Sequence, residues 1–159
     1  MSEKEKNEQI EVQDVPVEMQ DMSIFLPDNI EEAKEVKEVI SSRFKDKKGN
    51  PVPFIFKAIT TERINELEKE CTRFEKVRGQ GKVKKFDSTR FVERIAVETT
   101  VYPDFKSGEL RRVYKTEDPI EVAKKVLSIG GEFQRWIELT QEVNGFGDDE
   151  EVLEEIAKN

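Results

Sequence analysis

The stretch Val39–Ile59 reads Val-Ile-Ser-Ser-Arg-Phe-Lys-Asp-Lys-Lys-Gly-Asn-Pro-Val-Pro-Phe-Ile-Phe-Lys-Ala-Ile, and it combines period-two alternation with turn residues. Side chains alternate across a β-strand, so every second residue shares a face. Asp46 and Gly49 suit the first and fourth positions of a type I turn, with Gly49 at positive φ. The stretch therefore predicts a β-hairpin over residues 39–59. The residues expected on its shared apolar face are Ile40, Ser42, Phe44, Val52, Phe54, Phe56 and Ala58.

Two prolines limit the pairing of the returning strand. Pro51 and Pro53 have no N–H group to donate to a strand ladder. The returning strand is therefore expected either at the edge of the sheet or paired with the first strand only beyond Pro53. Residues 29–37 fit either a short helix or a lead-in to the first strand. Because an isolated two-stranded hairpin is marginally stable in water, helices from the rest of the chain must cover it.

Apolar residues at helical spacing, together with capping residues, predict helices after the hairpin. The clearest start is Asp118-Pro119, which places a capping side chain before a proline in the first turn. Gly130-Gly131 is expected to separate that helix from the next. The sequence therefore predicts an α+β fold that is mostly α-helical, with one β-hairpin packed by five or six helices. The expected helices span about residues 61–73, 89–100, 107–114, 118–127 and 132–143, and the first two are capped by Thr60 or Thr61 and by Asp87 or Ser88.

Negative charge is concentrated at the two ends of the chain. Residues 1–38 hold 12 acidic and 4 basic residues, and residues 148–159 hold 6 acidic residues and 1 basic residue. The whole chain of 159 residues has a formal net charge of −8, although residues 39–147 hold 22 basic and 17 acidic residues. The domains expected are a disordered acidic N-terminus at 1–21, a single α+β domain at 22–147 and an acidic C-terminal helix at 148–159.

Short apolar clusters lie in or beside these acidic ends. Ile24-Phe25-Leu26 either docks onto the domain or binds a partner while exposed in the free protein. The C-terminal segment carries apolar residues along one side of its expected helix, and the same two alternatives apply to it. The candidate partner-binding residues are Ile24, Phe25, Leu26, Phe146, Val152, Leu153 and Ile156.

The most basic stretch is residues 73–90, with seven basic and two acidic residues. Gly79 and Gly81 indicate a mobile basic loop over residues 75–87. Aromatic and basic side chains together are typical of nucleic-acid-binding surfaces. The acidic ends and the sequence pI of about 4.9 would repel phosphate groups, so a nucleic-acid-binding module using residues 73–90 is an alternative and not the main hypothesis.

The composition argues against catalysis and metal binding. The chain has no histidine, which is the commonest general base and metal ligand, and it has one cysteine. Cys71 falls on an apolar helical stripe and is expected to be buried and inert. No cofactor motif and no apolar run of about 18 residues occurs. We therefore expect a cytoplasmic, non-enzymatic protein without a cofactor, a metal or a membrane partner.

A series of short motifs runs through the chain in a fixed order. The motifs are Arg43-Phe44-Lys45-Asp46, Gly49-Asn50-Pro51-Val52-Pro53-Phe54, Phe56-Lys57-Ala58-Ile59-Thr60, Lys69-Glu70-Cys71-Thr72, Val101-Tyr102-Pro103-Asp104, Gly131-Glu132-Phe133 and Glu142-Val143-Asn144-Gly145-Phe146. As a set they closely resemble the XkdN-like tail assembly chaperones of phages and defective prophages of Gram-positive bacteria. The resemblance covers about residues 25–159, which is nearly the whole chain.

The resemblance implies a function in phage tail assembly. Proteins of this family act in the host cytoplasm, bind the long tape measure protein, keep it soluble and help to recruit tail tube subunits. They are absent from the finished virion. The resemblance implies the same partners and the same localisation for this chain. A structural tail component is the alternative, although the chain lacks the long strands with which tube subunits close rings.

Overall fold

The computed structural model describes residues 20–147. The chain divides into two compact units, Met1–Ala33 and Lys34–Asn159. The described residues of the first unit form two short 3-10 helices, η2 (Met22–Phe25) and η3 (Pro27–Asn29). Neither helix buries a side chain.

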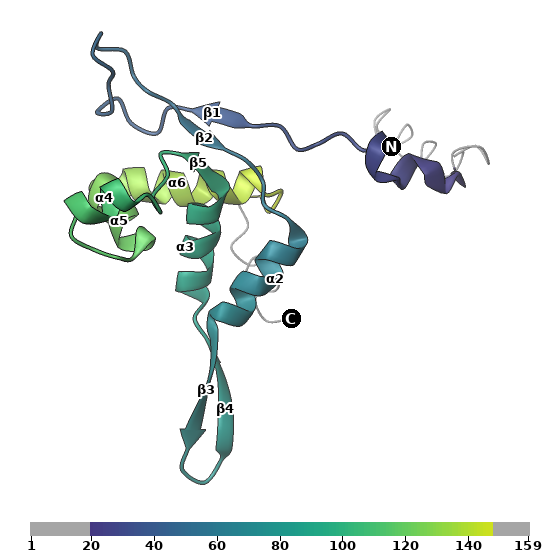
Figure 1. Ribbon diagram of the computed structural model, residues 1–159. Helices are drawn as coiled ribbons and strands as arrows, with labels where there is room; N and C mark the ends of the chain where they lie inside the picture. The colour runs from purple at the N-terminus through teal and green to yellow at the C-terminus, as the bar shows by residue number, and fades with distance from the viewer. Residues whose placement is uncertain (1–19, 148–159) are drawn as a thin grey trace, which may run out of the picture. The chain divides into compact units, whose positions relative to one another are not determined.

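The predicted α+β fold is confirmed, and its main sheet lies in the second unit. Three short antiparallel strands pair in the order β1-β2-β5 (Figure 1), namely β1 (Val36–Glu38), β2 (Phe54–Phe56) and β5 (Thr100–Tyr102). Val36 lies opposite Phe56 across the first pair, and Ile55 lies opposite Tyr102 across the second. The expectation of an edge position for the returning strand was therefore wrong, because β5 pairs with its free side. The regular ladder between β1 and β2 begins at Phe54, but Lys45 and Pro51 also form an isolated antiparallel bridge, so pairing is not confined to the residues beyond Pro53 as the alternative predicted.

The turn inside the predicted hairpin forms as expected. Gly49 has a φ of 85° and donates its N–H to the carbonyl of Asp46 at 3.0 Å. The Asp46 carboxylate accepts N–H bonds from Lys48 and Asn50 at 2.8 and 2.9 Å. The first strand, however, precedes the predicted range, and residues 30–35 lead into it without forming a helix. Residues 39–53 thus form a long loop closed by its own turn.

Five α-helices lie in the described part of the second unit. They are α2 (Thr61–Glu70), α3 (Ser88–Thr99), α4 (Gly108–Val113), α5 (Pro119–Val126) and α6 (Gly130–Val143). The first four begin after a residue whose side chain accepts a backbone N–H of the first turn. These caps are Thr60, Asp87, Ser107 and Asp118. The sequence indicated this capping for α2, α3 and α5.

Three details of the helices differ from the prediction. Gly130 and Gly131 form the first turn of α6, and the break after α5 lies before them, at residues 127–129. Glu132 accepts the N–H of Ile129 at 3.3 Å at the start of α6. Helix α2 ends at Glu70 and not near residue 73, because the strand β3 already begins at Thr72. Helix α4 spans Gly108–Val113 and not 107–114, because Ser107 and Tyr114 are its capping residues.

Helix α3 contributes to two apolar clusters. Ala96 belongs to the larger cluster, whereas Phe91 and Ile95 belong to the smaller one. Trp136 of α6 is fully buried, and its Nε1 donates to Thr100 Oγ1 at 2.8 Å. The buried residues of the larger cluster include Phe54, Phe56, Ala96, Phe105, Ile120, Leu127, Trp136 and Leu139, and those of the smaller one are Leu67, Cys71, Phe91 and Ile95.

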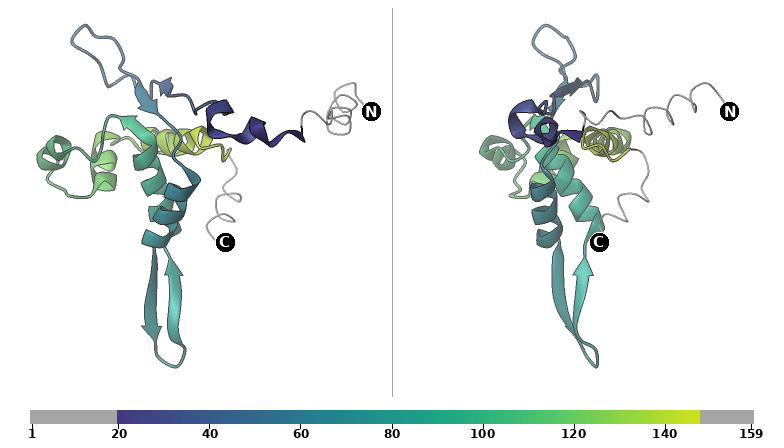
Figure 2. Two further views of the ribbon diagram at one scale, coloured as in Figure 1. Left: turned by 45° about the vertical axis from the view of Figure 1, so that its right-hand side comes forward. Right: turned by 90° about the vertical axis from the view of Figure 1, so that its right-hand side faces the viewer.

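A second antiparallel hairpin occupies the stretch that was expected to be a mobile loop. Strands β3 (Thr72–Val77) and β4 (Gly81–Phe86) pair along their whole length, and Figure 2 shows that they extend away from α2 and α3. Gly79 and Gly81 have φ angles of 85° and 71°, a conformation that glycine adopts without strain. The prediction of a mostly helical fold with a single hairpin was therefore wrong, because the described residues contain two separate sheets.

Candidate partner-binding surfaces

The N-terminal apolar segment, residues 22–30, exposes most of its large side chains. Asp21 accepts the N–H of Ser23 at 2.9 Å, and the Asn29 side chain donates to the Ser23 carbonyl at 2.7 Å. These local bonds hold the backbone in two tight turns that enclose no core. Five exposed apolar residues within nine form the kind of surface that binds partners. They are Met22, Ile24, Phe25, Leu26 and Ile30, with exposed fractions from 47% for Ile24 to 72% for Met22.

The other candidate residues are placed differently. Phe146 belongs to the second unit, is half-buried, and donates its N–H to the carbonyl of Gln141 at 3.0 Å. Gly145, with a φ of 82°, turns the chain out of α6 just before it. The expected C-terminal helix and its apolar residues Val152, Leu153 and Ile156 lie outside the described residues and stay predictions.

The basic hairpin, residues 72–86, carries six basic residues and one acidic residue. The single carboxylate, Glu75, pairs with Arg73 at 3.0 Å and with Lys85 at 3.3 Å. Within residues 20–147, no carboxylate lies at ion-pairing distance from the other four bases of the hairpin. These four are Lys76, Arg78, Lys82 and Lys84.

The register of the hairpin places like charges beside an exposed aromatic ring on one face. Lys76 lies opposite Lys82, and Phe74 lies opposite Lys84. The Phe74 residue is 66% exposed. Like charges directly opposite each other on neighbouring strands destabilise a hairpin. This face is therefore suited to an anionic partner that also offers an apolar contact.

An open groove of about 380 Å³ lies at the base of the basic hairpin. Arg73, Lys85 and Arg90 bring three positive charges to its lining, and Glu70 and Asp87 bring two negative charges. The positive charges of this groove are thus largely balanced from within the chain. The positively charged side chains without a carboxylate partner lie elsewhere on the basic hairpin, outside the lining of this groove.

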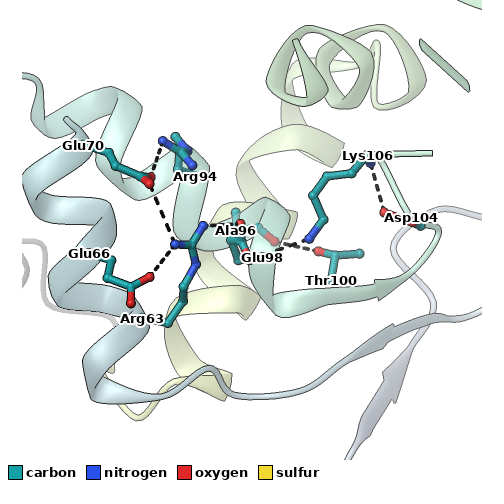
Figure 3. Close-up of polar contacts among 9 residues, drawn as sticks. All are labelled: Arg63, Glu66, Glu70, Arg94, Ala96, Glu98, Thr100, Asp104 and Lys106. Atoms are coloured by element: carbon teal, nitrogen blue, oxygen red, sulfur yellow. Dashed lines mark hydrogen bonds and ion pairs between the residues drawn. The ribbon is translucent and has the colours of Figure 1, made fainter. Parts of the chain in front are cut away.

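Ion pairs join α2 to α3 and so anchor the base of the basic hairpin (Figure 3). Arg63 of α2 binds Glu98 of α3 at 2.9 Å, and Arg94 of α3 binds Glu70 of α2 at 2.8 Å. Lys106 approaches Glu98 at 3.6 Å. Burial alone would raise the pKa of Glu98, but the bond from Arg63 and the charge of Lys106 outweigh it and lower that pKa. The two helices from which the hairpin emerges are therefore held together on the side of these charges.

The described residues, 20–147, offer little for nucleophilic or metal chemistry. Cys71 is buried in the smaller apolar cluster, as expected, and burial raises the pKa of its thiol. Among residues 20–147, no three side chains of the metal-ligating types His, Cys, Asp and Glu gather where they could hold an ion. In the same part of the chain, no helix combines the length and the apolar character needed to cross a bilayer.

Sequence reasoning missed the pairing of the basic hairpin, although a signal for it was present. Two six-residue segments flank a three-residue connection that contains Gly79, and Gly81 begins the second segment, which is a typical hairpin spacing. Basic residues lie on both faces, with Lys76, Lys82 and Lys84 on the face of Phe74 and Arg73 and Lys85 on the other, so the alternation of apolar and polar residues that marks a strand is absent there. The spacing of the glycines was a better guide than hydrophobicity.

Comparisons with known proteins agree with one another. The sequence profile of the family described as "Phage XkdN-like tail assembly chaperone protein, TAC" matches residues 22–158. Two relatives from Bacillus subtilis (strain 168) align over 139 residues, which is 87% of this chain. One is the uncharacterized protein YqbN, which is 64% identical, and the alignment covers 93% of its length. The other is the phage-like element PBSX protein XkdN, which is 60% identical, and the alignment covers 94% of its length. The crystal structure of YqbN superposes with a TM-score of 0.69 at 57% identity, over 79% of this chain and 97% of that one.

Proposed function

The chain belongs to the phage XkdN-like tail assembly chaperone family, and we propose that it binds the tape measure protein and keeps it soluble while a tail is assembled. In this proposal it acts in the host cytoplasm, also contacts tail tube subunits and leaves before the virion is finished. The observation that carries the proposal is the N-terminal apolar segment, whose large side chains are exposed. An exposed apolar patch of this kind is typical of a binding site, because a partner that covers it removes apolar surface from water.

The chemistry of the segment suits a long helical client. An unassembled coiled-coil protein exposes a seam of apolar residues at every third or fourth position, and this seam drives aggregation. A short element with Ile24, Phe25 and Leu26 can cover part of such a seam through apolar contact. Because the element contains no core of its own, the contact stays small and reversible. Many copies along one client would shield it without folding irreversibly onto it.

The charge of the chain supports the same role. A net charge of −8 on each bound copy makes the complexes repel one another. The apolar contacts would therefore provide affinity for the client, and the charge would keep the complex dispersed. High salt is expected to weaken the repulsion between complexes more than the binding of the client, because salt screens charges but does not screen apolar contacts.

Co-expression tests the proposal directly. The tape measure protein encoded nearest to this chain is produced in a bacterial host with and without the chain, and its soluble fraction is measured after lysis. We expect the chain to raise the soluble fraction several-fold and to co-elute with the tape measure protein in size exclusion. An unchanged soluble fraction together with separate elution of the two proteins would rule the proposal out.

A further inference from the structure

We propose that the acidic C-terminal segment, residues 148–159, docks on the basic hairpin of the same chain and covers its Phe74 face. The docking is a property of the free protein. It goes beyond the proposed function and stands whether or not the chain binds a tape measure protein.

Charge complementarity identifies the occupant. The segment has six acidic residues and one basic residue, and the basic hairpin has the opposite balance of six basic residues to one acidic. Four of the hairpin bases have no ion-pair partner among residues 20–147, and Lys76 faces Lys82 across the strands. A carboxylate between these two lysines would relieve their repulsion. The exposed ring of Phe74 provides an apolar contact for the apolar residues of the segment, which are Val152, Leu153 and Ile156.

The segment starts close enough to reach the hairpin. Asn144, at the end of α6, accepts the N–H of Ile59 at 3.0 Å, so α6 ends beside the start of α2. Helix α2 has 10 residues and leads into β3, which puts the base of the hairpin about 15 Å further along. Twelve residues cover up to ~40 Å in extended conformation but only ~18 Å as an α-helix, so the docking requires the extended form and not the helix expected from the sequence. The segment can therefore pass α2 and lie along the hairpin.

The described residues also offer a competing place for the segment, which charge disfavours. An open groove of about 670 Å³ runs along α6, and Phe133 and Ile137 give it an apolar lining. Glu138 and Glu142 also line this groove, against the single base Arg135. Arg135 already pairs with Glu38 at 2.6 Å, whereas four bases of the hairpin have no ion-pair partner among residues 20–147, so a segment with six carboxylates fits the hairpin better than this groove.

The docking explains how a protein with a net negative charge can carry an exposed basic hairpin. An uncovered β-ribbon with several lysines attracts polyanions, and nucleic acid is the most abundant polyanion in a bacterial cell. A tethered acidic segment has a high effective concentration at the hairpin and so competes with free polyanions. The hairpin stays neutralised without a separate partner.

Paramagnetic relaxation in the full-length chain tests the docking. A nitroxide is attached through Glu155→Cys in a Cys71→Ala background, and the amide signals of ¹⁵N-labelled protein are recorded at low ionic strength. We expect selective loss of the signals from residues 74–84. The signals should return when Lys82→Glu and Lys84→Glu are introduced together, or in about 1 M salt, where the Debye length falls to ~3 Å.

A matched pair of substitutions controls for net charge. Lys47→Glu with Lys48→Glu makes the same change of charge at the exposed Asp46–Gly49 turn and should leave the signal loss at the hairpin intact. Signal loss that is absent, or confined to α6, would overturn the docking. Signal loss that also appears when nitroxide-labelled and ¹⁵N-labelled chains are mixed would assign the segment to a second copy and overturn docking within one chain. A short DNA duplex that binds the hairpin of the full chain without displacing the segment would identify nucleic acid as the occupant instead.

Discussion

Arg43 and Glu132 lie 89 positions apart in the sequence and form a two-point ion pair. The guanidinium donates from Nη2 to Oε1 at 2.6 Å and from Nε to Oε2 at 3.0 Å. These bonds from Arg43 lower the pKa of the Glu132 carboxyl to about 2. Glu132 also accepts the N–H of Ile129. One carboxylate therefore fastens the 39–53 loop to the first turn of α6 and completes that turn.

Glu132→Gln is expected to lower the free energy of unfolding at neutral pH by about 1–2 kcal/mol, near the low end for a hydrogen bond to a charged group because the Arg43 side chain is 45% exposed. The folded pKa lies below the value of the unfolded chain, so the ionised carboxylate stabilises the fold above about pH 4.5. This contribution is lost as the pH falls towards 2. Urea unfolding of both proteins between pH 7 and 2 should show a difference that shrinks across that window. The exposed Glu31→Gln is the control, and a constant difference at all pH values would contradict the assignment.

At the scale of elements, the junction of α2 and α3 decides where the basic hairpin points. Arg63 contacts two carboxylates of its own helix and Glu98 of α3, and these carboxylates raise the pKa of the guanidinium. A single exposed ion pair stabilises little, but several charges in a network hold a geometry. Without Arg63, the one ion pair that Glu98 keeps within residues 20–147 is the longer contact to Lys106, and Arg94 with Glu70 remains the ion pair between the two helices there.

Arg63→Met keeps an apolar side chain of similar length and removes the charge. It is expected to destabilise the protein by about 1–2 kcal/mol, because the partly buried Glu98 loses its main partner. Hydrogen exchange should also become faster in β3 and β4, since their anchor is loosened. Arg112→Met, at an exposed position of α4, is the matched control. Equal effects of the two substitutions on stability and on hairpin exchange would show that the network does not anchor the hairpin.

Elements with strong local signals were predictable from the sequence. Asp118-Pro119 starts α5, and Asp46 with Gly49 makes the predicted turn, because these signals act over a few residues. Strand β5 was missed because Thr100–Tyr102 is three residues long and pairs with β2 through a contact distant in sequence. The basic hairpin was missed because its basic residues lie on both faces, so its strands lack the alternation of apolar and polar residues that marks a strand.

At the scale of the whole molecule, sequence motifs identified the family, whereas the candidate surfaces were predicted in part. Ile24, Phe25 and Leu26 stood out because three apolar residues lie in an acidic segment, and all three are exposed. The basic face around Phe74 could not be predicted in the same way, since it exists only when β3 and β4 pair. Local composition therefore revealed one surface, and tertiary pairing created the other.

The central claim is that the N-terminal apolar segment binds the tape measure protein, and co-purification with a tagged chain tests it most directly. Three chains are compared: the unchanged protein, Ile24→Ser with Phe25→Ser and Leu26→Ser, and a control with three exposed apolar residues of the second unit replaced. The control substitutions are Val101→Ser, Val113→Ser and Ile129→Ser, at positions of similar exposure.

We predict that the substitutions at 24–26 reduce the co-purified tape measure protein at least several-fold, whereas the control retains most of it. Removing three apolar contacts of about 1–2 kcal/mol each is enough to abolish a modest affinity. The thermal midpoint of the chain with substitutions at 24–26 should be unchanged, because that segment buries no side chain. Equal co-purification of the tape measure protein by all three chains would contradict the account.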